Sequence, residues 1–312
     1  IERVKWALGQ APKTLPPAEQ PEFLTDAESS LMTHDRWTPR GVHRVPIHFG
    51  HGVRGNLYFK DGAPTPMPVV VWLHPLSYHS GYNEGYGVQG TTVYQRLAEN
   101  GFAVIAYDQC GFGLRLLEGR DFYKNHPRWS KLGRMVMDAR AAVSFAVEGR
   151  DAAKSAIPEF DTKRVFLLGY SSGALSAMYA GALDDRIAGV ACFSGWTPLR
   201  DTRNAKVTGG NRRLWELHAL QPRLGLFDGR ESEMPFDYDD VLGLVLPKPC
   251  LVVTPKRDRY ADFSAVVEVI DKVRSAKPRI AKGSFAWLAP DDTNRFQADQ
   301  HQEFINWTKT LE

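Results

Sequence analysis

The stretch from Arg164 to Met178, RVFLLGYSSGALSAM, is the feature that most constrains the fold of this chain. Its residues 165–169 carry no charge, are too few for a helix and follow the polar turn 161–163, so they predict a buried parallel strand. A helix is expected directly afterwards. The pentapeptide between them, Gly-Tyr-Ser-Ser-Gly at 169–173, has the G-x-S-x-G pattern that is typical of a nucleophilic serine on a strand-to-helix turn. Ser171 is therefore the predicted nucleophile.

The two glycines of this pattern make room for the turn. Gly169 and Gly173 stand two places on either side of Ser171 and lack the Cβ atoms that would keep strand and helix apart. The serine then lies at a helix N-terminus, where free N–H groups favour an oxyanion. The alternative is a Gly/Ser-rich turn without catalysis, but the strand and helix on either side favour the nucleophile.

Strands and helices alternate through the rest of the chain. A hairpin is expected about Gly50-His51-Gly52, because apolar and polar residues alternate on both sides of it. Further strands are expected at 69–73, 102–107, 187–193, 249–254 and 285–288, and helices at 91–100, 129–148, 211–220, 263–277 and 298–311. This order predicts an α/β fold with a mostly parallel central sheet, helices on both faces and ligands at the carboxyl ends of the strands.

The predicted organisation is one catalytic domain preceded by an arm. Residues 1–40 are rich in proline and polar groups, with one expected helix over 21–32, and the domain covers 41–312. Residues 196–247 interrupt the alternation, and we expect them to form a cap insertion above Ser171, the alternative being a long surface excursion.

Composition excludes several classes of function. The formal net charge is only +3, which does not favour a nucleic acid partner. The sequence contains no run of eighteen apolar residues, so it does not predict a membrane-spanning helix. The three cysteines are widely spaced and no histidine or cysteine pattern matches a metal site, so neither metal nor cofactor is expected. The chain opens on Ile1, and if it is a processed form this favours a location outside the cytoplasm.

A serine nucleophile needs a base and a residue that orients the base, and these follow it in the order acid, then histidine. Asp258 follows the expected strand 249–254 and is the predicted acid, with Asp262 as competitor and a salt bridge to Arg257 or Arg259 as the structural alternative. His301 is the predicted base, because only this histidine follows both the acid and the last strand. His218 is its rival.

The remaining site residues surround the strand that ends at Leu73. The backbone N–H groups of Leu76 and Ser172 are the predicted oxyanion donors, since Pro75 has no N–H to give. Residues expected to line the substrate pocket are His74, Tyr78, Tyr82, Tyr86, Trp196, Trp215 and His218.

Together, the serine motif, the loop after Leu73, Asp258 and the strand order resemble the α/β-hydrolase superfamily over about residues 41–310. Within it, YDQCGFG (107–113), WSKLGRMVMDARAAV (129–143) and PFDYDDVLGLVLPKPCLVV (235–253) resemble dienelactone-hydrolase-like and acetyl-xylan-esterase-like proteins. The resemblance implies that Ser171 is the nucleophile and Asp258 the acid. Two positions depart from it: Pro75 stands where relatives usually have glycine, and Asn294 where their catalytic histidine often falls.

These observations lead to three functional hypotheses. The first is a serine esterase that removes a small acyl group, such as acetate, from a carbohydrate or small-molecule ester through an acyl-enzyme. The second is a serine peptidase of the prolyl-oligopeptidase kind. The third is a hydrolase-like binding module that has lost its base. The sequence leaves the oligomeric state open.

Overall fold

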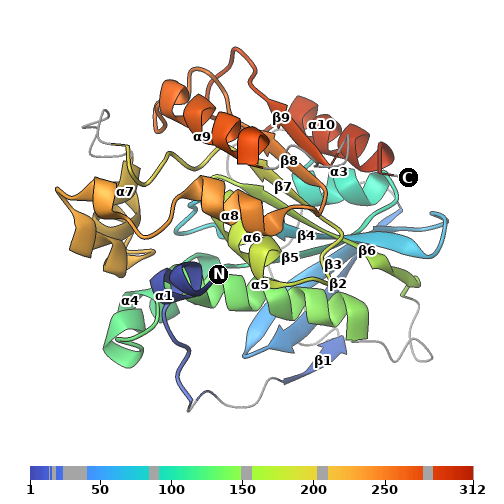
Figure 1. Ribbon diagram of the computed structural model, residues 1–312. Coiled ribbons are helices and arrows are strands. Elements are labelled where there is room, and N and C mark those ends of the chain that lie inside the picture. The colour runs from blue at the N-terminus through green and yellow to red at the C-terminus, as the bar shows by residue number, and fades with distance from the viewer. Residues whose placement is uncertain are drawn as a thin grey trace.

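A single sheet forms the centre of the molecule. The computed structural model describes residues 1–13, 15, 19–23, 41–83, 91–148, 157–201, 210–276 and 284–311. Within these residues nine strands form one sheet in the order β1-β2-β3-β5-β4-β6-β7-β8-β9 (Figure 1). The strands are β1 (Glu19–Phe23), β2 (Val42–Gly50), β3 (Val53–Lys60), β4 (Met67–Leu73), β5 (Ala103–Tyr107), β6 (Phe160–Tyr170), β7 (Gly189–Phe193), β8 (Cys250–Val253) and β9 (Phe285–Leu288).

The sheet is antiparallel at one edge and parallel elsewhere. Strands β2 and β3 pair as the predicted hairpin, and β3 pairs antiparallel with β5. From β5 through β4 to β9 every pairing is parallel, so the carboxyl ends of these strands meet at one edge. This arrangement confirms the predicted α/β fold with a mostly parallel sheet.

Helices cover both faces of this sheet. The main helices are α1 (Glu2–Leu8), α3 (Val93–Glu99), α4 (Leu116–Asn125), α5 (Lys131–Glu148), α6 (Ser172–Leu183), α8 (Tyr238–Val245), α9 (Phe263–Ala276) and α10 (Ala298–Lys309). One core cluster joins α1, α5, α6, α8 and α9 to one face, and a second joins α3 and α10 to the other. Strand β4 is apolar and almost wholly buried because its side chains enter both clusters.

Helix α6 is central because it is buried on every side. Eleven of its twelve residues are buried, and it packs between α5 and α8 against the sheet (Figure 1). Gly181 allows α6 to lie close to β7, because a Cβ at its position would lie 2.4 Å from the Val190 side chain. A helix that is apolar all round has no solvent face, so its N-terminus at Ser172 is held rigidly.

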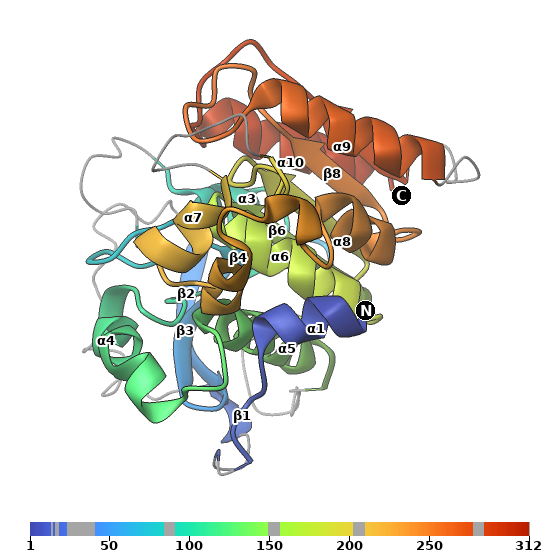
Figure 2. The ribbon, with the colours of Figure 1, turned by 60° about the vertical axis from the view of Figure 1, so that its left-hand side comes forward.

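The arm before residue 41 is partly built into the domain. Helix α1 buries Val4, Ala7 and Leu8 and packs against α5 (Figure 2). Strand β1 pairs with β2, so residues 21–23 are extended and not helical as predicted. The rest of the predicted helix lies outside the described residues.

Other elements differ from the sequence prediction in extent. Residues 161–163, predicted as a turn, belong to β6, which starts at Phe160 and pairs with β4 across a register shift. Helices α1, α4 and α8 were not predicted. The expected helix at 211–220 is instead a short α7 (Gly210–Arg212) followed by the π-helical turn η3 (Arg213–Leu217).

The segment that we expected to be a cap begins after β7. It contains α7, η3 and the short turns η4 (Pro222–Phe227) and η5 (Glu231–Glu233), and then returns to the helical layer as α8. The Tyr123 hydroxyl of α4 donates to the Ala219 carbonyl, and Leu132 N donates to Leu220 O at 3.1 Å. The segment is therefore anchored to α4 and α5. No helix in the described part of the chain is long and apolar enough to cross a membrane.

Candidate functional site

Ser171 occupies a strained turn at the carboxyl edge of the sheet. It lies between β6 and α6 with φ 54° and ψ −118°, in a region that residues with a side chain rarely adopt. A Cβ on Gly169 would lie 2.2 Å from Gly173 O, and one on Gly173 would lie 1.8 Å from Leu73 O. Both glycines are thus required by space, as the motif predicts. Gly195, after β7, is a third, because its Cβ would lie 2.1 Å from Ser171 O.

A cavity of about 680 Å³ opens above the serine. It is lined by Pro75, Leu76, Tyr170, Ser171, Arg213, Leu217, His218, Arg257, Arg259, Tyr260, Thr293 and Asn294. The lining brings together the turn after β6, the loop after β4, the loops after β8 and β9, and η3 of the 196–247 segment. Among the described residues of this lining there are three arginines and no carboxylate.

Arg213 is the charged side chain that contacts the serine. Its Nη2 atom donates to Ser171 Oγ at 3.5 Å, and its guanidinium lies over the Tyr260 ring, 4.6 Å from the centroid. A positive charge at this position stabilises negative charge on the serine oxygen or on an oxyanion beside it. The sequence interpretation missed Arg213, because no motif marks it and only the fold of the segment brings it to Ser171.

Asp258 lies in the loop after β8, as predicted, but its partner is an amide. Asn294 Nδ2 donates to Asp258 Oδ2 at 2.9 Å, and the Tyr170 hydroxyl donates to Asn294 Oδ1 at 2.7 Å. The backbone of Tyr260 donates to Asp258 Oδ1 at 2.9 Å. An amide side chain has no basic nitrogen, so Asn294 cannot take the serine proton as an imidazole would.

Arg257, Arg259 and Asp262, named above as partners or competitors of Asp258, each have another partner among the described residues, which for Arg259 is the Tyr260 hydroxyl. Arg257 pairs with Asp291 at 3.1 Å and not with Asp258. Asp262 accepts from Ser264 Oγ at 2.5 Å and from Ala265 N at 3.1 Å, so it caps the start of α9. Asp258 instead accepts from Asn294, a residue that lines the serine cavity.

The structure does not bring His301 to Ser171, which corrects our expectation of a hydrogen bond between them. His301 is 4% exposed on α10, and its ring packs against Phe296 with centroids 4.7 Å apart. Neither ring nitrogen has a hydrogen-bond partner in the described part of the chain. Burial lowers its pKa to about 4. His301 lies on the apolar face of α10 and points inward, as expected. It points into the contact between α10 and the sheet, and not toward Ser171.

His218 does line the serine cavity. Its Nδ1 atom shares a hydrogen bond of 2.9 Å with the Tyr78 hydroxyl. Burial and the nearby positive charges of Arg213 and Lys131 lower the pKa of this histidine to about 4. His218 is therefore neutral at pH 7 and retains a lone pair on one ring nitrogen.

The loop after β4 is fixed by polar contacts to the loop after β5. Gln109 N donates to His74 Nε2 at 2.9 Å, and Gln109 Nε2 donates to His74 O at 2.8 Å. Ser176 Oγ of α6 donates to Gln109 Oε1 at 2.7 Å. Burial lowers the pKa of His74 to about 4, so the ring is neutral and accepts from the backbone. His74 thus supports the loop that carries Leu76.

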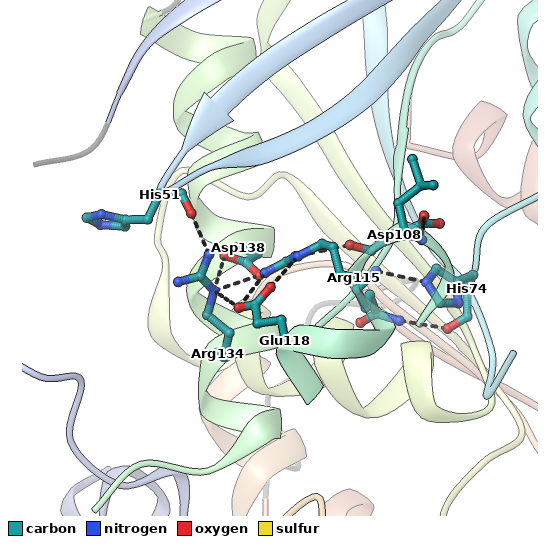
Figure 3. A network of polar contacts seen from close by, with 9 residues as sticks. His51, His74, Asp108, Arg115, Glu118, Arg134 and Asp138 are labelled. Carbon is teal, nitrogen blue, oxygen red and sulfur yellow. Dashed lines mark hydrogen bonds and ion pairs between the residues drawn. The ribbon is translucent and has the colours of Figure 1, made fainter. Parts of the chain in front are cut away.

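A buried ion network continues from this loop into α4 and α5 (Figure 3). Arg115 donates to Asp108 O at 3.0 Å and to Asp138 Oδ2 at 2.8 Å, and it forms a salt bridge with Glu118. Arg134 completes the network through Asp138 Oδ1 at 3.0 Å. The loop after β5 is therefore tied to the helical layer by charges held out of water.

The other residues predicted for the substrate pocket do not lie together in the structure. Tyr78 contacts His218 at the cavity, but His74 and Tyr82 line a second cavity. Trp196 packs on Tyr238 and Trp215 covers Gly225, so both close the core of their segment. Tyr86 lies outside the described residues.

Leu76 lines the serine cavity, and Ser172 is the first residue of α6, where a helix leaves its N–H groups unpaired. Both positions suit the predicted oxyanion donors. The search for metal ligands finds no cluster of three His, Cys, Asp or Glu side chains among the residues with described placement.

Comparison with solved structures supports the fold. A CE15 esterase from a marine bacterial metagenome matches with a TM-score of 0.68 at 15% identity, covering 99% of this chain and 89% of its own. A glucuronoyl esterase from Solibacter usitatus matches at 0.68 and 14%, covering 99% and 90%. A putative acetyl xylan esterase from Bacteroides fragilis matches at 0.63 and 13%, covering 96% and 84%. At such identities the likeness establishes the fold.

The amino-acid sequence also matches a protein family. No curated protein sequence matches this chain. The family model Hydrolase_4, described as serine aminopeptidase S33, matches residues 69–244, which is more than half of the chain and includes the turn that carries Ser171. This chain therefore belongs to the Hydrolase_4 family of serine hydrolases and has the α/β-hydrolase fold.

Proposed function

We propose that this protein is a serine esterase that hydrolyses a carboxylic ester of a carbohydrate through an acyl-enzyme on Ser171. The observation that carries the proposal is the strained Ser171, which opens into a cavity of about 680 Å³ beside the Arg213 guanidinium. The structural neighbours include glucuronoyl esterases and a putative acetyl xylan esterase, which supports a sugar ester as substrate.

The charges of the cavity favour a substrate with negative charge. Arg213, Arg257 and Arg259 all line it. Arg257 is paired with Asp291, whereas Arg213 and Arg259 have no ion pair within the described residues. Guanidinium groups bind carboxylates through paired hydrogen bonds. A sugar ester that keeps a free carboxylate elsewhere in the molecule fits this environment better than a neutral ester.

The base in this proposal is His218, which takes the place that we first gave to His301. The tautomer decides its role. If Nδ1 carries the proton and donates to the Tyr78 oxygen, the Nε2 lone pair is free to accept the serine proton. Tyr78 then does for His218 what an acid does in an ordinary triad, although a neutral hydroxyl stabilises the imidazolium less.

Ester hydrolysis by these residues proceeds in two steps, acylation of Ser171 and hydrolysis of the acyl-enzyme. The Ser171 oxygen bonds to the ester carbonyl carbon while its proton passes to His218, and the Leu76 and Ser172 N–H groups hold the oxyanion. The carbon–oxygen bond to the alcohol then breaks, and the alcohol takes the proton from His218. Water attacks the acyl-enzyme by the same route and releases the acid.

An ester panel tests this function. The panel contains p-nitrophenyl acetate, acetylated xylose, the methyl ester of glucuronic acid and a peptide amide. We expect hydrolysis of the sugar esters by the wild type, and loss of at least three orders of magnitude in kcat/KM with Ser171→Ala. Hydrolysis of the amide alone would instead support the peptidase hypothesis.

A second candidate function is favoured by Asn294. This residue places an amide at the acid-linked position, so the site lacks the imidazole that an ordinary triad has there. A protein with this site and no other base would bind an ester or its acid without cleaving it. Binding of the sugar acid by wild type and Ser171→Ala alike, with no turnover, would establish this alternative.

A further inference from the structure

The turn that follows Asp258 carries an arginine and a tyrosine into the wall of the serine cavity. Arg259 and Tyr260 line this cavity together with Arg213 from η3. The side chain of Asp258 has Asn294 as its partner and not an imidazole, but its other oxygen accepts from Tyr260 N at 2.9 Å. The carboxylate of Asp258 therefore fixes the turn that presents Arg259 and Tyr260.

The Tyr260 ring contacts two guanidinium groups. The guanidinium carbon of Arg213 lies 4.6 Å from the ring centroid, and that of Arg259 lies 4.6 Å from the same centroid. Arg259 Nη2 also donates to the Tyr260 hydroxyl. A cation over an aromatic face is attracted by the electrons of the ring. The ring therefore restrains two long, positively charged side chains that both line the cavity.

Neither guanidinium has a carboxylate partner within the described residues. Arg257, in the same loop, pairs with Asp291 at 3.1 Å, whereas Arg213 and Arg259 form no salt bridge in the part of the chain that the structure describes. Burial lowers the pKa of Arg213, and the nearby charge of Asp258 compensates this only in part. Guanidinium groups bind carboxylates through strong, paired hydrogen bonds, so an anion between these two side chains would supply the missing partner.

Both guanidinium groups can be reached from the cavity. Arg259 is exposed and Arg213 is half-buried. Arg213 Nη2 lies 3.5 Å from Ser171 Oγ. Because charge-assisted hydrogen bonds are about 2.8 Å long, a carboxylate oxygen on this nitrogen lies within about 6 Å of the serine oxygen. Such a carboxylate is close enough to belong to the molecule that Ser171 attacks.

We infer that Arg213 and Arg259, held on the Tyr260 ring, bind a free carboxylate of the substrate that lies only a few bonds from the ester carbonyl. The inference rests on the proposed function and narrows its substrate to esters with a carboxylate next to the bond that is cleaved. Arg213 and Arg259 are the binding residues of this carboxylate subsite, and Tyr260 is a positioning residue.

Two pairs of substrates test the subsite and show on which side of the ester the carboxylate lies. Mono-p-nitrophenyl succinate carries the carboxylate on the acyl group and is compared with p-nitrophenyl butyrate. Acetoxyacetate carries it on the alcohol and is compared with propyl acetate. We expect one of the anionic esters to be hydrolysed with a kcat/KM at least tenfold higher than that of its neutral counterpart. Equal kcat/KM values within both pairs would overturn the inference.

Variants of the loop after β8 test the residues. Arg259→Gln should bring the ratio of the two kcat/KM values close to one, mainly by raising KM for the anionic ester. Tyr260→Leu should do the same, whereas Tyr260→Phe keeps the ring and should keep most of the preference. Lys256→Gln removes an exposed cation that does not line the cavity, and it should keep the wild-type ratio. A ratio unchanged by Arg259→Gln, or equal effects of the two Tyr260 variants, would contradict the subsite.

A binding measurement separates this inference from the proposed function. If no ester is hydrolysed, the proposed function fails, but calorimetric titration with sodium succinate still measures the subsite. We expect saturable binding that is at least tenfold tighter than that of succinamide, the uncharged counterpart, and that is lost in Arg259→Gln but not in Lys256→Gln. Absence of succinate binding, or binding unchanged by Arg259→Gln, would overturn the subsite whatever the result with the esters.

Discussion

Asn294 is the residue that most distinguishes this site from an ordinary serine hydrolase. It accepts from Tyr170 and donates to Asp258, the contact that an imidazole Nδ1–H would make. Its side chain is shorter than that of histidine and has no basic atom. Asp258, the predicted acid, therefore orients an amide and not an imidazole.

Replacing Asn294 with histidine should create the missing base. In Asn294→His, Nδ1–H can donate to Asp258, which leaves Nε2 directed away from the acid and toward the serine cavity. We expect the rate of p-nitrophenyl acetate hydrolysis to rise at least tenfold over the wild type, measured as kcat/KM. A rate no higher than that of a matched Asn294→Gln variant, in a folded protein, would show that Asp258 and Ser171 are not aligned for a triad.

With His218 as the proposed base, the esterase rate should have an unusual pH dependence. The neutral imidazole is the active form of a base, and its pKa is lowered to about 4 by burial and by Arg213 and Lys131. Esterase kcat/KM should thus stay level from pH 8 down to about 5 and fall only as His218 is protonated near pH 4. An ordinary histidine base would give a fall near its unperturbed pKa of about 6.5. His218→Ala should reduce kcat/KM at least a hundredfold, and a smaller loss would remove His218 from the mechanism.

At the scale of elements, the buried ion network of α4 and α5 holds the loop after β5. Asp138 is fully buried and compensates both Arg115 and Arg134. Asp138→Ala should lower the free energy of unfolding by about 3–5 kcal/mol, because it leaves two buried guanidinium groups with Glu118 as their remaining carboxylate. Asp121→Ala, which breaks the exposed pair with Arg120, should cost less than about 1 kcal/mol. Equal losses in urea unfolding experiments would contradict the role of the network.

The elements were predictable wherever the local pattern decided them. The hairpin, the parallel strands and helices α3, α5, α9 and α10 follow from apolar periodicity and turn residues. Helices α1 and α8 were not predicted, because their apolar faces are short. These faces are recognisable only from tertiary contacts, which α1 makes with α5 and α8 makes with α6 and α9. The site shows the same limit, since Ser171 and Asp258 have motif positions but Arg213 reaches the serine only through the fold of its segment.

For the whole molecule, buried neutral histidines predict sensitivity to acid. The pKa values of His74 and His301 are about 4 in the folded state, against about 6.5 when unfolded. The unfolded chain binds more protons in this window, so stability falls as pH decreases from about 6.5 toward 4. Between pH 7 and pH 5 we expect each histidine to lower the free energy of unfolding by about 2 kcal/mol.

Urea unfolding at the two pH values measures this effect. In His301→Phe the difference between pH 7 and pH 5 should shrink by about 2 kcal/mol, because the contribution of this histidine is gone. An unchanged difference would show that His301 is not buried as a neutral ring.

The proposed function requires Ser171 to be an activated nucleophile, although Asn294 occupies the acid-linked position. Its most direct measurement is the labelling of the wild-type protein with a fluorophosphonate probe, followed by mass spectrometry of the modified peptide. We expect a stoichiometric adduct on Ser171 that is absent in Ser171→Ala and forms at least a hundredfold more slowly in His218→Ala. No adduct on Ser171 in the folded wild-type protein would contradict it.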